Sequence, residues 1–289
     1  MFTTYWLYFL YLISLIKLIM KMKKSYVVII AALLTSTFSC AQGKKSFEVV
    51  KADYELMNLA KVDINTYKKN KDGAYILFDG KSLDGWRGYN KEYVPSKWSI
   101  ENGTLKFSKS PAISNAEGGD IIFAYDFKNF ELSFEWKISE AGNSGVFFLA
   151  KEVKDQPIYI SSPEYQILDN DKHPDASKGV DGNRKSASLY DMIPAKPQNA
   201  KPVGEWNLSK IVVKGNNVEH YQNGVLVVKY TIRTPEWTKL LDASKFSKDK
   251  WPLAYELLNN VGGSTKSGVI GFQDHGDDVW YRNITIKPL

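Results

Sequence analysis

Carboxylates, amides and imidazoles, the groups that move protons or bind sugars, gather in four short stretches of the sequence. The first stretch spans residues 163–170 and is followed by His173. If it is a strand, Glu164 and Gln166 lie on the same face, because side chains alternate with a period of two. A carboxylate beside an amide can bind sugar hydroxyls or accept a proton, although a single glutamate on a strand is also common on a solvated face. Asp169 follows at the strand end, where it could act as a base or stabilise a turn.

The second and third stretches offer one carboxylate and one aromatic–amide pair. Asp191 ends the run Ser-Leu-Tyr-Asp and could be a ligand, a base or a turn cap. Trp206 precedes Asn207, so an indole could stack on a pyranose face while the amide bonds its hydroxyls. Packing in the core is the alternative for a tryptophan. We include all three side chains among the candidate substrate-binding residues.

The fourth stretch brings four different functional groups onto what we expect to be one hairpin. Gln273 ends one predicted strand, Asp274 and His275 follow it, and Arg282 lies on the next strand. Because Arg282 alternates with Ile284, we expect it to point toward the buried side, where it needs an acidic partner such as Asp274. His275 could transfer a proton, and the guanidinium could stabilise a negative charge on a substrate.

A divalent metal ion is a further option for these clusters. Asp169, His173 and His275 are of the right chemical types to be ligands, but the sequence does not show that they converge. An EF-hand beginning at Asp169 is excluded, because Pro174 and Val180 stand where that loop needs glycine and glutamate. The sequence also lacks a glycine-rich phosphate loop, a serine elbow and an HExxH motif.

Alternating patterns indicate that β-strands position these groups. Residues 130–138 alternate apolar and polar side chains, and Glu135 on the polar face is a further candidate for binding substrate. Residues 218–222 and 225–230 flank Asn-Gly, the pair that suits a type I′ hairpin turn. Further strands are expected at residues 75–78, 98–107, 146–149, 165–168, 206–214, 268–273 and 279–286.

Many short strands without a βαβ rhythm, together with 13% aromatic residues, predict an all-β fold, a two-sheet jelly-roll sandwich. Short peripheral helices are expected over residues 54–69 and 234–245, the second with Thr234 as its cap and Pro235 in its first turn. Long loops on a rigid sandwich are where a site is usually found. The candidates are the loops at residues 108–119, 151–162 and 170–204.

The N-terminal residues 1–39 have the features of a secretory signal rather than of a folded domain. Lysines precede an apolar stretch, and Cys40 stands at the expected cleavage point. We expect Cys40 to be acylated as the first residue of a lipoprotein of the bacterial envelope that faces the periplasm. Residues 40–70 would form a tether with a short helix, and residues 71–289 the folded domain. Residues 1–19 precede the signal and indicate a misassigned start codon.

Export changes the charge of the protein. Residues 1–39 hold four lysines and no acidic residue, so the net charge falls from +6 to about +2. No long basic run remains, so we expect no nucleic-acid partner and no membrane contact beyond the lipid anchor. Cys40 is the only cysteine. Once it is acylated no disulfide can form, and a hydrophobic core must hold the domain together.

The ordered set of motifs resembles the 3-keto-disaccharide hydrolase family, also described as 3-keto-glucoside lyase/hydratase. The resemblance covers about residues 74–289. One departure is Tyr221-Gln222, which stands before Asn223-Gly224 where the family usually has the run His-Trp-Leu-Asn-Gly. The motifs are LFDGKSLDGW at 77–86, NSG at 143–145 with Asn143, EYQILD at 164–169, LYD at 189–191, GEWN at 204–207, QNG at 222–224, QDHG at 273–276 and YRNI at 281–284.

The resemblance implies a concanavalin-like or laminin-G-like jelly roll, an exported Bacteroidetes lipoprotein, and a glucoside or disaccharide substrate already oxidised to a ketone at C3. A C3 ketone acidifies the C2 proton, so one general base can start an elimination if a cation or donor stabilises the enolate. Glu164, Asp169 and His275 are the candidate bases, with Arg282 or a divalent metal ion at the enolate. Two alternatives stay open: a conventional glycoside hydrolase on the same scaffold, and a non-catalytic glycan-binding module.

Overall fold

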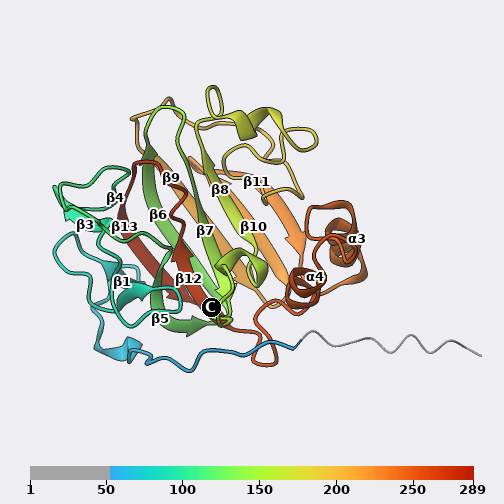
Figure 1. The fold of residues 1–289 in the computed structure, drawn as a ribbon, viewed down its shortest axis with the longest axis horizontal. Coiled ribbons are helices and arrows are strands. Elements are labelled where there is room, and N and C mark those ends of the chain that lie inside the picture. The colour runs from blue at the N-terminus through green and yellow to red at the C-terminus, as the bar shows by residue number, and fades with distance from the viewer. Residues whose placement is uncertain (1–52) are drawn as a thin grey trace, which may run out of the picture. The chain divides into compact units, whose positions relative to one another are not determined.

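Two antiparallel β-sheets pack face to face in residues 53–289, the part of the chain that the computed structural model describes (Figure 1). The larger sheet has the order β11 (Val225–Thr231), β10 (Asn217–Gln222), β9 (Asn207–Lys214), β6 (Phe130–Ile138), β13 (Val279–Pro288), β4 (Thr104–Phe107) and β3 (Trp98–Glu101), and β1 (Tyr75–Phe78) also pairs with β13. The smaller sheet has the order β2 (Trp86–Gly88), β5 (Ile121–Phe127), β12 (Gly268–Phe272), β7 (Asn143–Ala150) and β8 (Glu164–Leu168). The predicted two-sheet sandwich is confirmed.

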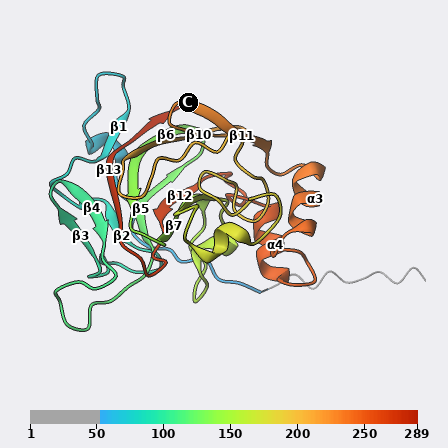
Figure 2. The ribbon, with the colours of Figure 1, turned by 90° about the horizontal axis from the view of Figure 1, so that it is seen from above.

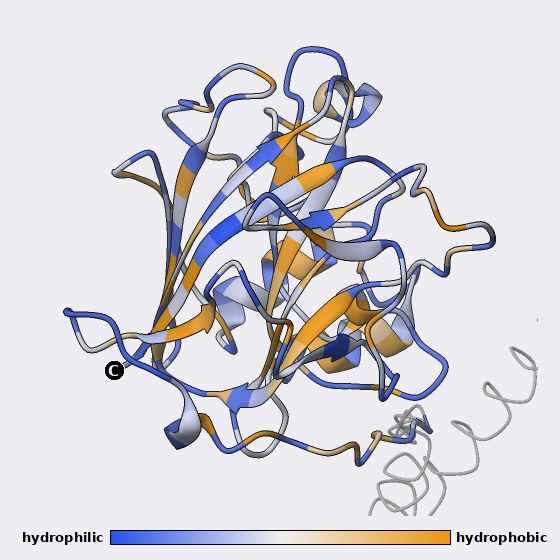
Figure 3. Ribbon diagram, turned by 90° about the vertical axis from the view of Figure 1, so that its left-hand side faces the viewer, coloured by the Kyte–Doolittle hydropathy of each residue, from blue (hydrophilic) through white to orange (hydrophobic). Residues whose placement is uncertain are grey.

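The space between the sheets is filled by aromatic and branched side chains. Along β6 the burial alternates strictly, so Phe134 and Trp136 point inward while Glu135 points out. Phe272 and Tyr281 meet from opposite sheets with ring centroids 4.1 Å apart. Figure 3 shows the hydrophobic residues concentrated on the strands and the hydrophilic residues on the loops. This core makes a rigid scaffold for the loops at its ends.

The smaller sheet is covered on both of its faces. Every residue of β7, β8 and β12 is buried. On the face away from the larger sheet, Phe147 and Ile122 form a second apolar cluster with Ile158 of the 3₁₀ helix η2 (Ile158–Ile160). Figure 2 shows loops and helices lying against this side of the sandwich. A polar side chain on this outer face is therefore in the protein interior, where it needs a partner.

The helix predicted over residues 234–245 is present as α3 (Pro235–Ala243). The Thr234 side chain accepts a hydrogen bond from the backbone N–H of Trp237 (3.3 Å), and Pro235 occupies the first turn as predicted. A second helix, α4 (Pro252–Asn259), was not predicted. Helix α3 ends at Ala243, two residues earlier than predicted, so Lys245 lies in the segment between the two helices.

Two expectations for the N-terminal part have different outcomes. The helix expected over residues 54–69 is wrong, because only the 3₁₀ turn η1 (Ile64–Thr66) forms there. The segment instead runs in extended form and makes a bridge from Leu56 to Val153. The signal sequence and Cys40 lie outside the described residues and stay predictions. Within residues 53–289 no helix has the length and hydrophobicity needed to cross a bilayer.

The hairpin predicted around Asn223-Gly224 is confirmed, with positive φ at both turn residues (48° and 82°) as a type I′ turn requires. The last predicted pair is not a hairpin. β12 and β13 belong to different sheets, so residues 273–278 form a loop that crosses from one sheet to the other. This crossing places the polar Gln-Asp-His-Gly run at the rim of the sandwich.

The predicted inward orientation of Arg282 is also wrong. The pairing of β13 with β6 shifts register between Arg282 and Thr285, and Asn283 has a φ of 51°. This irregularity changes the phase of the alternation, so Arg282 lies on the outer face together with its partner Glu135 (Nη2 to Oε2, 2.7 Å).

A buried ion pair fixes the covering layer to the smaller sheet. Arg87 on β2 donates two hydrogen bonds of 2.6 Å to the carboxylate of Glu152, and both side chains are at least nine-tenths buried. Lys61, from the N-terminal extended segment, lies 3.4 Å from the same carboxylate. Burial alone would raise the pKa of Glu152, but the cations hold it below its ordinary value.

Replacing Glu152 with Gln should destabilise the fold by about 3–5 kcal/mol, because it leaves the guanidinium of Arg87 buried without a counter-charge. Urea denaturation would measure the free energy of unfolding. Glu55→Gln is the matched control, because Glu55 forms an exposed pair with Lys154 (2.9 Å) and its loss should change stability by less than about 0.5 kcal/mol. Equal effects of the two substitutions would contradict the anchoring role of Glu152.

Candidate functional site

A cavity of about 170 Å³ lies on the outer face of the smaller sheet, where strand ends meet three loops. It is much smaller than the roughly 300–1,000 Å³ of pockets for drug-sized ligands, which suits a single small polar ring. Its wall is mostly polar. The lining residues are Asn143, Tyr159, Glu164, Gln166, Tyr190, Lys245, Gln273 and His275.

The floor of the cavity follows from strand register. Tyr165 points between the sheets, where its hydroxyl lies 2.7 Å from Ser209 Oγ, so Glu164 and Gln166 point outward as predicted. Gln166 pairs with Gly145 on β7, and the backbone N–H of Gln273 donates to the carbonyl of Gly145 (2.9 Å). Side chains from β7, β8 and the end of β12 thus meet around one glycine.

The carboxylate of Glu164 occupies the space above Gly145. A Cβ at position 145 would lie 2.3 Å from Glu164 Oε1, so any other residue there would displace the carboxylate from this position. The amide nitrogen of Gln166, in the orientation that satisfies its neighbours, donates to the same oxygen (3.2 Å) and to the carbonyl of Ser144 (3.0 Å). Burial raises the pKa of Glu164 to about 8, with Lys245 opposing the rise. Glu164 is therefore a strong base once it is ionised.

Asp120 is a second carboxylate on this face, and sequence reasoning missed it. It precedes β5, where Ile121 pairs with Phe272, so Asp120 lies beside Gln273 across the strand pair. Its Oδ1 accepts the backbone N–H of Asp274 (2.9 Å). Burial raises the pKa of Asp120 to about 7, and its negative charge adds to the rise in the pKa of Glu164. Nothing in the local sequence marks it, because its neighbours are simply two glycines and an apolar strand.

Lys245 supplies a cation that sequence reasoning also missed. Its ammonium lies over the rings of Tyr190 (4.4 Å to the centroid), Phe246 (4.9 Å) and Tyr159 (5.3 Å). Burial lowers the pKa of Lys245, while Glu164 and Asp191 act to raise it. Among the described residues, no carboxylate or carbonyl oxygen forms a hydrogen bond with Nζ. The predicted helix ended at this lysine, so the pattern gave no reason to single it out.

Asp191, a candidate substrate-binding residue, instead holds the cavity wall together. Its Oδ1 accepts a hydrogen bond from Arg184 Nε (2.6 Å), and its Oδ2 accepts the backbone N–H of Lys245 (2.7 Å). The neighbouring Tyr190 hydroxyl donates to Asp175 Oδ2 (3.0 Å). The carboxylate thereby fixes the backbone that carries Lys245 and the loop that carries Tyr190.

Two amides and His275 form the mouth of the cavity. His275 is exposed, and its Nε2 lies 3.3 Å from Asn143 Nδ2, whose side chain is buried. Gln273 is 8% exposed, and its Oε1 has no hydrogen-bond partner. A buried amide oxygen that lines a cavity without a partner is expected to accept a hydrogen bond from a ligand. The structure therefore brings together five of the predicted residues, which are Asn143, Glu164, Gln166, Gln273 and His275.

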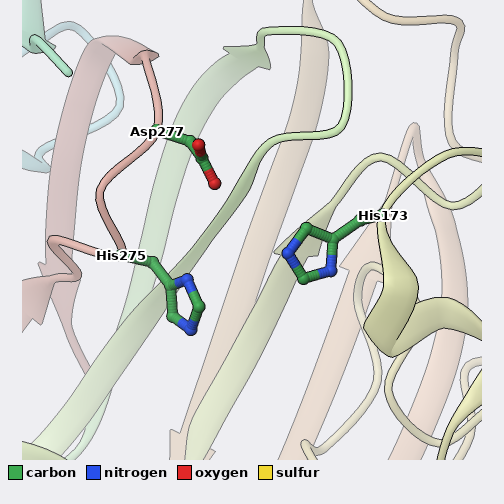
Figure 4. A group of neighbouring side chains, drawn as sticks. All are labelled: His173, His275 and Asp277. Carbon is green, nitrogen blue, oxygen red and sulfur yellow. The ribbon is translucent and has the colours of Figure 1, made fainter. Parts of the chain in front are cut away.

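His173, His275 and Asp277 converge at the edge of this mouth, each with a potential ligand atom within 4.8 Å of the others (Figure 4). Two imidazoles and a carboxylate suit a divalent ion in type. However, Nδ1 of His173 accepts the backbone N–H of Asp175 (3.1 Å), so the neutral ring carries its proton on Nε2. A metal-binding histidine normally donates from its second nitrogen. The group as arranged does not fit a metal ion.

Asp169, predicted both as a base and as a metal ligand, does not line the cavity or join the two histidines. Its carboxylate accepts three backbone N–H groups, from Ala141 (2.7 Å), Asp171 (3.0 Å) and Lys172 (3.2 Å). It therefore stabilises the turn after β8, and Asp277 stands near the histidines where Asp169 was expected.

The remaining predicted residues lie elsewhere. On the outer face of the larger sheet, the Arg282 guanidinium stacks on Trp206 (4.0 Å) and pairs with Glu135. The buried Asn207 accepts a hydrogen bond from the backbone N–H of Lys201 (2.8 Å). Asp274 accepts the backbone N–H groups of Gly119 (2.7 Å) and Gly276 (2.9 Å), so it shapes the loop that carries His275.

Known proteins resemble this chain over nearly all of its described part. It matches the family described as 3-keto-alpha-glucoside-1,2-lyase-like domain over residues 73–287. It is 56% identical over 261 residues to the 3-keto-disaccharide hydrolase of Bacteroides thetaiotaomicron, covering 86% of this chain and 90% of that protein. Two solved Parabacteroides distasonis structures, both described as candidate glycosyl hydrolases, are 28% and 26% identical with TM-scores of 0.63 and 0.54. Each covers 75% of this chain, and 94% and 99% of its own.

Replacing Asp169 with Asn should lower the free energy of unfolding by about 1–3 kcal/mol, because a single amide oxygen cannot accept all three backbone N–H groups. Turnover per folded molecule should change only a few-fold, because the side chain does not line the cavity. Urea denaturation and assays well below the melting temperature separate the two quantities. A loss of turnover of about 10²-fold, the scale of a general acid–base group, with unchanged stability would return Asp169 to the catalytic residues.

Proposed function

This chain belongs to the 3-keto-alpha-glucoside-1,2-lyase-like family, and we propose that it cleaves 3-keto-glucosides by elimination followed by hydration. The family and the 56% identity to a 3-keto-disaccharide hydrolase support a glycosidic-bond-cleaving enzyme that acts on 3-keto sugars. The observation that carries the elimination is the carboxylate of Glu164, held above Gly145 in a cavity that also contains a cation.

The ketone at C3 makes one base sufficient to start the reaction. Glu164 takes the proton from C2, and the electron pair of that C–H bond forms the C2=C3 bond of an enolate, with its charge on O3. The enolate then collapses. The C3 ketone re-forms, C1=C2 becomes a double bond, and the C1–oxygen bond breaks with its electrons on the leaving oxygen. His275 at the mouth of the cavity donates the proton that the leaving oxygen needs.

Hydration completes the cleavage. Water adds its oxygen to C1 and gives one proton to His275, and a proton returns to C2 from Glu164, so the products are a free 3-keto sugar and an alcohol. Gln273 accepts a hydrogen bond from a sugar hydroxyl in this scheme, which gives its unpaired Oε1 a partner. A conventional glycosidase instead needs an acid and a second carboxylate roughly 5 to 9.5 Å apart around C1. The second buried carboxylate, Asp120, already accepts the backbone N–H of Asp274 and does not supply that pair.

Glu164 must be ionised to act as the base, so kcat/KM should rise with pH up to about 8. The charged groups that act on it are Lys245, which lowers its pKa, and Asp120 and Asp175, which raise it. Glu164→Gln should lower turnover by about 10²-fold or more across this range. The measurement is a pH–rate profile corrected for the uncatalysed decay of the 3-keto sugar. A flat profile between neutral and alkaline pH would assign the base elsewhere.

In D₂O, deuterium should appear at C2 of the released 3-keto sugar, because the proton that Glu164 takes from C2 exchanges with solvent before a proton returns to C2. The enzyme should turn over 3-keto glucosides but not the matched native glucosides. A chelator should leave the rate of cleavage unchanged. Mass spectrometry and NMR of the products measure all three outcomes.

Four other outcomes would contradict the proposed elimination. Cleavage with C2 untouched, once free 3-keto sugar is shown not to exchange on that timescale, would indicate direct hydrolysis. Equal activity on native glucosides would indicate a conventional glycosidase, and binding without cleavage would indicate a glycan-binding module. Loss of activity on chelation, restored by a divalent ion, would contradict the metal-free scheme.

A further inference from the structure

We propose that Lys245 is a catalytic residue whose ammonium binds the C3 ketone oxygen and stabilises the enolate that forms there. This assignment rests on the proposed function. It also predicts the substrate class, because a native glucoside has no C3 ketone to become an enolate.

The ammonium of Lys245 and the carboxylate of Glu164 share one cavity. Lys245 lines the same cavity as Glu164, and its charge acts on that carboxylate. A base at C2 and a cation at O3 address neighbouring atoms of one sugar ring, so both groups must lie in one small cavity. The two side chains meet this requirement from separate elements, β8 and the segment that follows α3.

The hydrogen-bonding capacity of Nζ is unused. An ammonium has three donors, yet in residues 53–289 Nζ of Lys245 forms no hydrogen bond or ion pair, and it lies over the faces of Tyr159, Tyr190 and Phe246. Aromatic faces attract a cation but accept no strong hydrogen bond. The donors therefore remain available for an oxygen atom in the cavity.

The backbone of Lys245 is fixed in advance. Asp191 accepts its backbone N–H (2.7 Å) and is itself held by Arg184 Nε (2.6 Å). Donors that are already in place where charge develops stabilise a transition state without reorganisation. Asp191 and Arg184 are thus positioning residues for the ammonium.

The other two cations considered for this role, the Arg282 guanidinium and a metal ion at the His173 group, do not meet these requirements. Arg282 lies on the outer face of the larger sheet with Glu135, and the His173 group presents a protonated nitrogen rather than a metal site. In the step itself, Glu164 takes the C2 proton and the C–H electrons form C2=C3. The resulting charge on O3 accepts hydrogen bonds from Nζ of Lys245, which keeps its protons. When the enolate collapses, O3 becomes a ketone oxygen again.

The test uses the full-length protein and three substitutions: Lys245→Met, Lys245→Gln, and the control Lys248→Met at an exposed lysine of the same segment. Both Lys245 variants should lose about 10²–10³-fold in kcat on a 3-keto-glucoside, the usual scale for one donor to a developing oxyanion. They should lose as much in C2 deuterium exchange of a 3-keto analogue with hydrogen in place of the leaving group at C1. The pH at which kcat/KM rises should also move upward, because Glu164 loses the charge that lowers its pKa.

Melting temperatures decide whether a variant is folded, and the neutral, polar Gln variant serves if Met disturbs the wall. Loss of exchange and cleavage together, with an upward shift of the pH profile, supports the assignment. Wild-type protein that cleaves 3-keto-glucosides while a folded Lys245 variant retains exchange within a few-fold of Lys248→Met overturns it and leaves the proposed function standing. Wild-type protein that cleaves no 3-keto-glucoside overturns the proposed function itself.

Discussion

The covering of the smaller sheet on both faces is the constraint on which the rest of the site depends. A sheet with one wet face would leave Glu164 solvated, with an ordinary pKa and little strength as a base. Here loops and η2 bury that face, and the second apolar cluster around Phe147 seals it. The carboxylate then stands in a low-dielectric environment that favours its protonated form. Its pKa of about 8 is the result, and Gly145 is the residue that leaves room for it.

Burying Glu164 has a second consequence, because an ionised carboxylate in such a place needs a nearby positive charge. Lys245 meets that need without a direct hydrogen bond, since its ammonium rests on aromatic rings. Burial raises the pKa of Glu164 and lowers the pKa of Lys245, so it favours the neutral form of each side chain. The attraction between the two charges opposes both shifts. The pair therefore stays reactive. A tight ion pair would have held the carboxylate charged, weakly basic and shielded from a substrate.

The sequence predicted the parts of this site that depend on strand alternation. Glu164 and Gln166 on one face, the capped helix at Thr234 and the Asn-Gly hairpin all follow from local patterns.

The sequence could not predict features that arise from how distant segments pack. The bulge near Asn283 reversed the phase that had placed Arg282 inside. Asp120 and Lys245 were missed because neither stands in a polar motif, and tertiary structure brings both close enough to act on the charge of Glu164. Asp169 was predicted to be a base because a carboxylate can either take a proton from a substrate or accept backbone N–H groups in a turn, and the sequence does not distinguish the two.

The geometry also supports the proposed elimination over a displacement at C1. Displacement at C1 needs an acid and a nucleophile or water on different sides of the bond, so both sides of the sugar must be lined by carboxylates. A sheet floor presents its side chains from one side only, and here it offers Glu164 with amides around it. Oxidation at C3 moves the difficult step from C1 to the adjacent C2–H bond. A base on the floor and a cation on the wall are then enough, and the opposite side can remain open for the leaving group.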